Sequence, residues 1–182
     1  MWDDCASAPK ERTSDRRGIA GDVFVMKIAG AACDSGADLE EVRRITEKAR
    51  DSLRTIGVAT APGMIPGLEK PTFELGEKEI EYGMGLHGEP GIQRTTMRPA
   101  DELTGTLLFN LLKDMPVKAG EEVCVLVNGL GSTTILELSI VYRKLRELLD
   151  EKGIQVYDSD LNSFCTCQEM GGFSITIMKL DQ

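Results

Sequence analysis

The sequence predicts an α/β (α+β) fold in which helices pack on a mixed sheet. Runs with strand periodicity alternate with helical patterns over residues 56–182. This alternation is typical of layered folds in which helices cover a sheet. The first 54 residues carry helical patterns and no clear strand, so we expect two parts: a tail with two helices over residues 1–54 and a sheet domain over residues 55–182. The first part has no sheet of its own to cover and would be incomplete alone.

Two helices are predicted before the sheet, over residues 17–36 and 37–57. In the second helix, Asp38 with Glu41 three residues later resembles a capping box. Residues 1–18 are polar and of mixed charge, which predicts a loop or a ragged end. The apolar residues that recur at helical spacing are Val23, Val25, Met26, Ile28 and Ala29, then Leu39, Val42, Ile45, Ala49 and Leu53.

From residue 57 the chain turns extended and breaks at two prolines. It then takes on the glycine, proline and charge content of a surface loop, which we interpret as a domain boundary followed by a hairpin-like excursion. An uninterrupted apolar run at residues 123–127 is typical of a strand covered on both faces. The other predicted elements are strands at residues 80–86, 154–164 and 172–180 and helices at residues 100–115 and 132–153.

Composition excludes several classes of function. A net charge of −9 disfavours binding to nucleic acid or to an anionic membrane surface, because like charges repel. No apolar run approaches 18 residues, and the N-terminus has no apolar segment typical of a secretory signal, so we expect a cytoplasmic location. Five cysteines at irregular spacing, with a single histidine, are a poor set of zinc ligands. We therefore expect free thiols and no metal site.

The only histidine, His87, lies in the sequence "EYGMGLHGEPG" at residues 81–91, among four glycines and a proline. A lone histidine is more often a structural residue than a catalyst, yet these glycines allow the backbone to approach a ligand closely. The junction between a strand and a loop is also a frequent place for a functional site. Glu81 and Glu89 are both candidates to orient the imidazole ring. The residues by themselves leave both interpretations open.

Two other segments carry a weaker functional signal. "NGLGSTT" at residues 128–134 could present backbone N–H groups to an anion at a helix start, but its spacing is neither Walker A nor GxGxxG. A tight turn with an N-cap at Ser132 or Thr133 explains it equally well. "CTCQEMGGFS" at residues 165–174 has no second histidine to activate a thiol. We expect a bend between strands there, with Gly171 and Gly172 allowing positive φ.

Together and in this order, these segments resemble the substrate-binding subunit of dihydroxyacetone kinases. "GMGLHGEPGI" is similar to that family's histidine loop, "VLVNGLGSTTILELSIVYRKL" to its strand, turn and helix, and "FCTCQEMGGFSITIMKLD" to its ending. "RRGIAGDVFVMKIAGAACDSGADLEEV" and "IGVATAP" resemble the segment that joins its two domains. The likeness extends over about residues 16–181 and implies the second domain of the family, preceded by helices left from a truncated Rossmann-like first domain.

The resemblance implies that His87 captures dihydroxyacetone as a covalent hemiaminal, for phosphorylation to dihydroxyacetone phosphate, with Gly85 and Gly88 beside the substrate. It implies no cofactor on this chain, because ATP with magnesium, or ADP, binds a separate nucleotide-binding subunit or domain in the family. It further implies a homodimer for the intact protein. A neutral imidazole nitrogen is a nucleophile near pH 7, and glycerol has no carbonyl for it to attack.

The sequence also departs from the family pattern at several places. The family's first domain supplies another histidine, a lysine and an aspartate thought to act as base, and the segments that carry them are not found here. Met26 stands where the family commonly has a histidine, and the sequence stops at Gln182, short of the family's tryptophan-containing tail. The chain alone is therefore expected to lack the base and the phosphate donor site. The alternative is a non-catalytic interaction or regulatory module that retains the fold.

Overall fold

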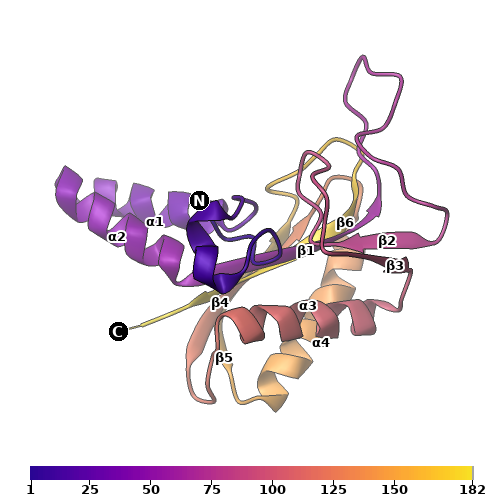
Figure 1. Ribbon diagram of the computed structural model, residues 1–182. Coiled ribbons are helices and arrows are strands. Elements are labelled where there is room, and N and C mark those ends of the chain that lie inside the picture. Colours follow the sequence, from indigo (N-terminus) through magenta and orange to yellow (C-terminus); the bar gives the residue numbers. More distant parts are fainter. Residues whose placement is uncertain (182) are drawn as a thin grey trace.

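Strands β1 (Leu53–Ala61) and β6 (Gly171–Lys179), far apart in the sequence, pair antiparallel at the centre of a six-stranded sheet (Figure 1). The computed structural model describes residues 1–181. The strand order is β3-β2-β1-β6-β4-β5, in which β4 and β5 pair parallel and the other neighbours antiparallel. The predicted mixed sheet with packed helices is confirmed.

The remaining strands are β2 (Glu79–Tyr82), β3 (Gln93–Thr96), β4 (Glu122–Gly129) and β5 (Gln155–Asn162). The helices are η1 (Lys10–Asp15), α1 (Asp22–Asp34), α2 (Leu39–Asp51), α3 (Ala100–Asp114) and α4 (Ile135–Glu151). No helix within residues 1–181 combines the length and the apolar character that a membrane crossing requires.

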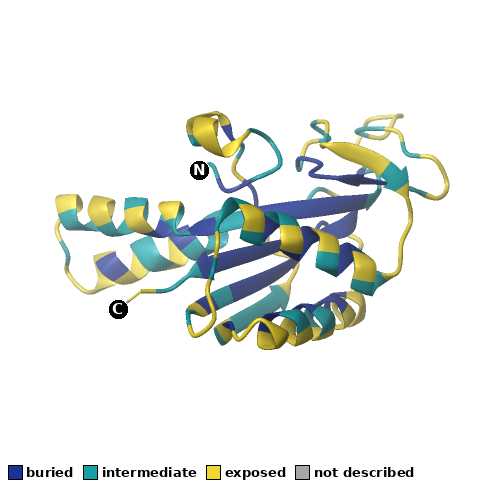
Figure 2. Cartoon of the chain, turned by 60° about the horizontal axis from the view of Figure 1, so that its bottom comes forward, coloured by how far each residue is buried: buried dark blue, intermediate teal, exposed yellow. Residues whose placement is uncertain are grey.

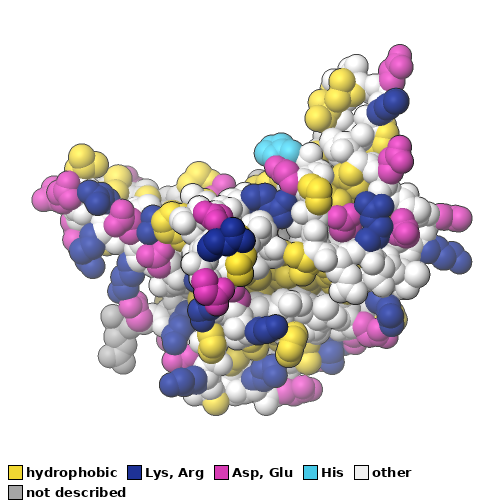
Figure 3. Space-filling model, in the orientation of Figure 1, with side chains coloured by type: hydrophobic (Ala, Val, Ile, Leu, Met, Phe, Trp, Pro, Cys, Tyr) yellow, Lys and Arg dark blue, Asp and Glu magenta, His cyan; other side chains and the backbone are white. Residues whose placement is uncertain are grey.

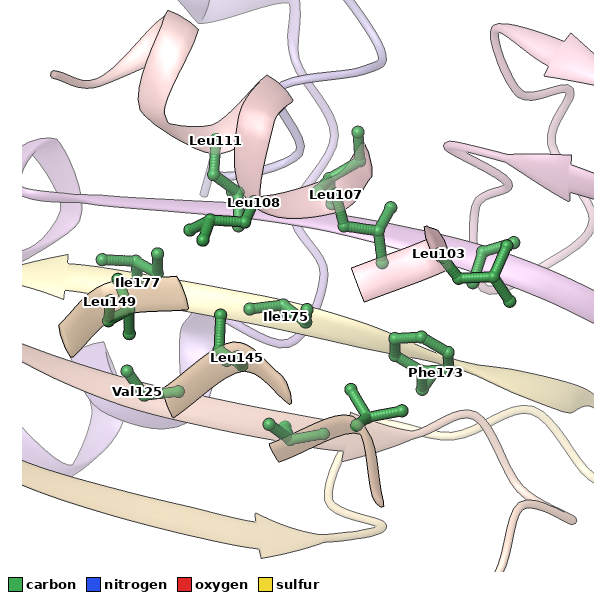
Figure 4. Packing of buried hydrophobic residues seen from close by; sticks show 14 of the residues in the cluster. Leu103, Leu107, Leu108, Leu111, Val125, Leu145, Leu149, Phe173, Ile175 and Ile177 are labelled. Atoms are coloured by element: carbon green, nitrogen blue, oxygen red, sulfur yellow. The ribbon is translucent and has the colours of Figure 1, made fainter. Parts of the chain in front are cut away.

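Helices α3 and α4 lie on one face of the sheet and form the main hydrophobic core (Figures 1 and 4). Their apolar residues recur every three or four positions, so each helix presents one buried stripe to the strands (Figure 2). The strand residues that face them alternate, as the period of two requires. The labelled members of this core are Leu103, Leu107, Leu108, Leu111, Val125, Leu145, Leu149, Phe173, Ile175 and Ile177.

Helix α4 begins with a reciprocal capping box at Thr134. The Thr134 hydroxyl accepts a hydrogen bond from the Glu137 amide (3.4 Å), and the Glu137 carboxylate accepts one from the Thr134 amide (2.8 Å). The prediction of an N-cap at Ser132 or Thr133 is therefore wrong by one or two residues. The stretch offers several hydroxyl side chains in a row, and only the backbone geometry selects among them.

Helices α1 and α2 pack against each other and extend past the end of the sheet (Figure 1). The N-cap predicted at Asp38 is present, with its carboxylate 2.9 Å from the Glu41 amide. The expectation that these helices have no sheet to cover is wrong, because Val25 and Ala49 pack against Leu53 of β1 and Met178 of β6. The division into parts 1–54 and 55–182 stays a prediction, although β1 already begins at Leu53.

The strand predicted at residues 80–86 is shorter, because β2 ends at Tyr82. Gly83 has φ +71°, a left-handed conformation that ends an extended strand. Strand β3 has no counterpart among the predicted elements. It is an edge strand of four polar residues, paired only with β2, so its sequence has no apolar alternation.

The first residues are an ordered part of the sheet region, which corrects the prediction of a ragged end. Asp3 and Asp4 are fully buried. The Thr55 amide donates to the Asp3 carbonyl (2.8 Å), and the Cys5 amide donates to the Thr55 carbonyl (3.0 Å). Because β2 pairs only with a later part of β1, the N-terminal residues take the edge of β1 that β2 leaves open.

Candidate functional site

The single histidine lies on the connection between β2 and β3, which we call the histidine loop (residues 83–92). Hydrogen bonds within the loop fold it into tight turns: the Gly85 amide donates to the Glu89 carbonyl (3.0 Å), and the Gly88 amide donates to the Gly85 carbonyl (3.1 Å). At the loop's ends, the Gly83 amide donates to the Gly57 carbonyl of β1 (2.7 Å) and the Ile92 amide to the Tyr82 carbonyl (2.8 Å). The loop is thus held to the central strand.

His87 projects into solvent from the tip of this loop, with 86% of its side chain exposed (Figure 3). Its Nδ1 lies 3.2 Å from Oε1 of Glu89, and its backbone amide donates to the other carboxylate oxygen of Glu89 (2.9 Å). A carboxylate only accepts hydrogen bonds, so Nδ1 carries the proton and the Nε2 lone pair is free in the neutral ring. Within residues 1–181, no hydrogen bond of the protein reaches Nε2.

Of the two carboxylates expected to orient the ring, only Glu89 does so. Burial acts to raise the pKa of Glu89, but hydrogen bonds from backbone amides and from His87 outweigh it and hold the pKa below its ordinary value. Glu81 is buried and serves the loop differently. It accepts hydrogen bonds from the Gly91 amide (2.7 Å) and from the guanidinium of Arg94 (2.8 Å), and so fixes the loop's return to β3.

The glycines beside His87 are required by close contacts within the protein. A Cβ on Gly85 would overlap the Glu89 carboxylate and would lie 2.8 Å from Nη1 of Arg17. Gly88 has φ +84°, and a Cβ there would lie 3.0 Å from the Thr72 carbonyl oxygen. These glycines therefore allow the backbone and the Glu89 carboxylate to take their positions around His87.

The histidine loop lies at the end of the sheet where β1 and β4 finish and β6 begins. The other two segments singled out in the sequence, residues 128–134 and 165–174, lie at the same end. Met84 of the loop packs with Leu130 and Met170 in a small buried cluster. The turn after β4 and the segment before β6 are joined by hydrogen bonds from the Cys167 amide to the Leu130 carbonyl (2.8 Å) and from the Ser132 amide to the Met170 carbonyl (3.0 Å). All three segments thus meet at one end of the sheet.

The neighbouring thiols are poor nucleophiles, as the sequence suggested. Burial raises the pKa of Cys165 to about 11, helped by the negative charges of Asp22 and Asp3. The pKa of Cys167 is also raised, by burial and by the charge of Glu89. A thiol attacks as the thiolate, and these shifts disfavour it near neutral pH. In the described part of the chain, no three His, Cys, Asp or Glu residues lie together as metal ligands.

The segment before β6 is a bend, and one of the two glycines that follow it uses the positive φ that glycine allows. Both glycines belong to β6, and only Gly172 has a positive φ, at +122°; the other positive φ is that of Glu169, at 60°. Near the end of β4, Asn128 is fully buried and its side chain holds the backbone of Phe164 and Cys165 at 2.8–2.9 Å. These residues have structural roles that fix the surroundings of the loop.

The ion pairs of Arg16 and Arg17 were missed in the sequence, and the Arg17 pair lies beside the loop. Arg17 pairs with the buried Asp4 (2.8 Å), and Arg16 pairs with Asp114 at the end of α3 (2.6 Å). Arg54 joins the second pair at 2.7 Å. The available signal was the presence of acids and arginines together within residues 1–18, a composition that a solvated end shares.

Comparison with known proteins identifies the family. The family model described as the Dak1 domain matches residues 1–182. The chain belongs to the Dak1 domain family. This Dak1 domain is 42% identical over 181 residues to the dihydroxyacetone-binding subunit DhaK of PTS-dependent dihydroxyacetone kinase 2 from Listeria innocua, covering 100% of the chain and 54% of that protein. It is 39% identical to an L-erythrulose kinase of Pectobacterium atrosepticum over 186 residues, all of this chain and 32% of the kinase.

Solved structures with the same fold include a regulator as well as a kinase. The dihydroxyacetone kinase operon co-activator DhaQ matches with a TM-score of 0.92 at 29% identity, over 100% of the Dak1 domain described here and 56% of that chain. The dihydroxyacetone kinase of C. freundii, in complex with AMP-PNP and Mg²⁺, matches with a TM-score of 0.83 at 29% identity. The match covers 92% of the Dak1 domain described here and 30% of the kinase chain. The chain thus spans about half the length of the dihydroxyacetone-binding subunits that it matches.

Proposed function

We propose that this Dak1 domain captures dihydroxyacetone, or a closely related short ketose, through a covalent bond between His87 and the ketone carbon. The observation that carries the proposal is the exposed ring of His87, with Nδ1 held by Glu89 and Nε2 directed away from it. Relatives that are named for dihydroxyacetone binding and for erythrulose phosphorylation support the choice of a ketone.

The proposed capture balances with the groups present. The Nε2 lone pair attacks the carbonyl carbon, a C–N bond forms, and the π electrons of the C=O bond move onto oxygen. The ring becomes cationic, and its Nδ1 proton passes to the Glu89 carboxylate while the alkoxide takes up a proton from solvent. Glu89 then returns its proton to solvent, so the product is a neutral hemiaminal and no oxidant or reductant is needed. Glycerol, which has no carbonyl, is not a substrate for this step.

Gly85 and Gly88 belong to the proposed ketone site because their missing side chains let Glu89 and His87 take these positions. Phosphorylation of the captured ketone to its phosphate would be a joint reaction. We propose that the phosphoryl donor, ATP with magnesium or another phosphoryl carrier, is held by a separate nucleotide-binding subunit or domain, and that the intact protein is a homodimer in the cytoplasm.

Carbon NMR with dihydroxyacetone labelled at the carbonyl carbon tests the capture directly. The wild-type chain is expected to convert the trigonal carbon signal into a protein-bound tetrahedral one, and labelled glycerol is expected to give no bound signal. His87→Ala and His87→Asn should abolish the tetrahedral signal and leave the circular dichroism spectrum unchanged, because the exposed ring adds little packing. A tetrahedral signal that persists in either variant, or that never forms in wild type, contradicts the proposal.

The second candidate is a ketone-sensing regulatory module without phosphotransfer, and the similarity to the co-activator DhaQ favours keeping it. The two candidates share the adduct and differ in whether it is then phosphorylated. Addition of a nucleotide-binding kinase subunit with ATP and Mg²⁺ should yield dihydroxyacetone phosphate if the chain belongs to a kinase. An adduct that never becomes phosphorylated would favour the regulator.

A further inference from the structure

Arg17 lies between η1 and α1, next to the histidine loop although 70 positions separate it from His87 in the chain. Its backbone is fixed on both sides: the carbonyl accepts from the Asp4 amide (3.2 Å), and the amide donates to the Ser7 hydroxyl (3.0 Å). The side chain is 23% exposed, so most of it is enclosed by the protein.

One side of the guanidinium binds a carboxylate that is itself anchored to the sheet. Nε and Nη2 of Arg17 lie 3.0 and 2.8 Å from Oδ2 of Asp4. The other oxygen of Asp4 accepts from the Ala6 amide (3.0 Å), and Asp4 pairs with Thr55 of β1 in an isolated bridge. Because Asp4 is 1% exposed at its side chain, this pair is a fixed, desolvated support and not a fluctuating surface contact.

The other side of the guanidinium reaches both ends of the loop turn that carries His87. Nη2 donates to the Gly83 carbonyl (2.9 Å), and Nη1 makes a longer contact with the Pro90 carbonyl (3.5 Å). Nη1 also lies 2.8 Å from where a Cβ of Gly85 would be, on the side occupied by the Glu89 carboxylate. Arg17 thus contacts the residues that bracket His87 and touches neither the ring nor Nε2.

We propose that Arg17, held by Asp4, is the positioning residue of the histidine loop: it joins Gly83 and Pro90 and so fixes the direction of the His87 ring. A planar guanidinium can serve a carboxylate and two carbonyls at once, whereas a lysine ammonium is a single point of charge. The pair with Asp4 also neutralises the cation, so its effect on His87 is geometric. The inference rests on the proposed function for its consequence in catalysis, and the loop geometry can be tested without it.

The experiment compares Arg17→Lys with Arg16→Lys, its matched control one residue away. Arg16 is equally an arginine in a buried pair, but its side chain bonds to Asp114 on α3 and to the Ala8 carbonyl, and not to the loop. Two quantities are measured in each protein: hydrogen exchange of the Gly85, His87 and Gly91 amides relative to β4 amides, and the adduct with carbonyl-labelled dihydroxyacetone. The ratio to β4 removes any global loss of stability.

Arg17→Lys is expected to lower the relative protection of the loop amides about tenfold and to weaken ketone capture by a similar factor, the scale of one lost charge-assisted hydrogen bond. Arg16→Lys should change neither relative quantity, even where its melting temperature falls further. Unchanged loop protection in Arg17→Lys, or equal loss in both variants, overturns the inference. If wild type forms no adduct, the proposed function fails, and loop protection alone still decides the role of Arg17.

Discussion

Replacing Asp114 by asparagine should destabilise the protein far more than an ordinary surface substitution. The last residue of α3 accepts two hydrogen bonds from Arg16 (2.6 and 2.8 Å) and one from Arg54 (2.7 Å). The Arg16 side chain is 0% exposed. Asparagine keeps the shape but is neutral, so the buried Arg16 cation loses its partner charge. Removing one member of a buried ion pair costs about 3 kcal/mol or more.

That cost predicts a melting temperature lower by about 6–12 °C, at roughly 2–4 °C per kcal/mol for a domain of this size. Burial acts to raise the pKa of Asp114, but Arg16 and Arg54 outweigh it and hold the pKa below its ordinary value. The stabilisation by the carboxylate is therefore present above the unfolded pKa, near 3.9, and is lost as the pH falls through the folded value. The difference in free energy of unfolding between wild type and Asp114→Asn should narrow below about pH 4.

Urea denaturation followed by circular dichroism at neutral and acidic pH measures this gap. Asp101→Asn is the control, because Asp101 lies in the first turn of the same helix and pairs with Arg143 in solvent, with both side chains about half exposed. An exposed pair of this kind contributes about 1 kcal/mol or less. The reasoning is refuted if the two variants lose equal stability at pH 7, or if the Asp114→Asn gap stays constant down to acidic pH.

Two further predictions concern other polar contacts. Burial raises the pKa of Asp4 to about 6, in spite of the charge of Arg17, so wild type should lose stability from this group as the pH rises from about 4 to about 6. Asp4→Asn should remove that component from the pH profile of the melting temperature, and a profile parallel to wild type would contradict it. Thr134→Ala should cost about 1 kcal/mol in urea denaturation because α4 loses its N-cap. The free energy of unfolding of Ser132→Ala should stay within about 0.5 kcal/mol of wild type. Equal losses in the two variants would show that the capping box at Thr134 does not stabilise α4.

Local patterns in the sequence were enough to predict the elements whose buried face is marked by the spacing of their apolar residues. Helices α3 and α4 and strands β4 and β6 were predicted close to their observed bounds, because one apolar stripe or run identifies each buried face. Edge strand β3 was not predicted, because its four residues are polar and mostly exposed. The predicted pairing of a glutamate with His87 was found at Glu89, only two positions away in the chain.

The ion pairs of Arg16 and Arg17 could not be predicted from local patterns. Arg16 and Asp114 lie 98 positions apart, and Arg17 and Gly83 lie 66 positions apart. A charge that finds its partner across the fold has the same local sequence as a solvated one. Only the topology, which lays the first residues along the open edge of β1, brings Arg17 to the histidine loop and Arg16 to Asp114.

The placement of β6 has a consequence for how the chain acquires its structure. As β6 lies between β1 and β4, each of these strands keeps one edge unpaired until residues 171–179 have been synthesised. During synthesis of the residues before β6, β1 therefore remains unpaired along one edge. Such long-range pairing slows folding and prolongs the exposure of strand edges. A nascent chain halted before β6 should be a chaperone client, whereas one halted after it can close its sheet.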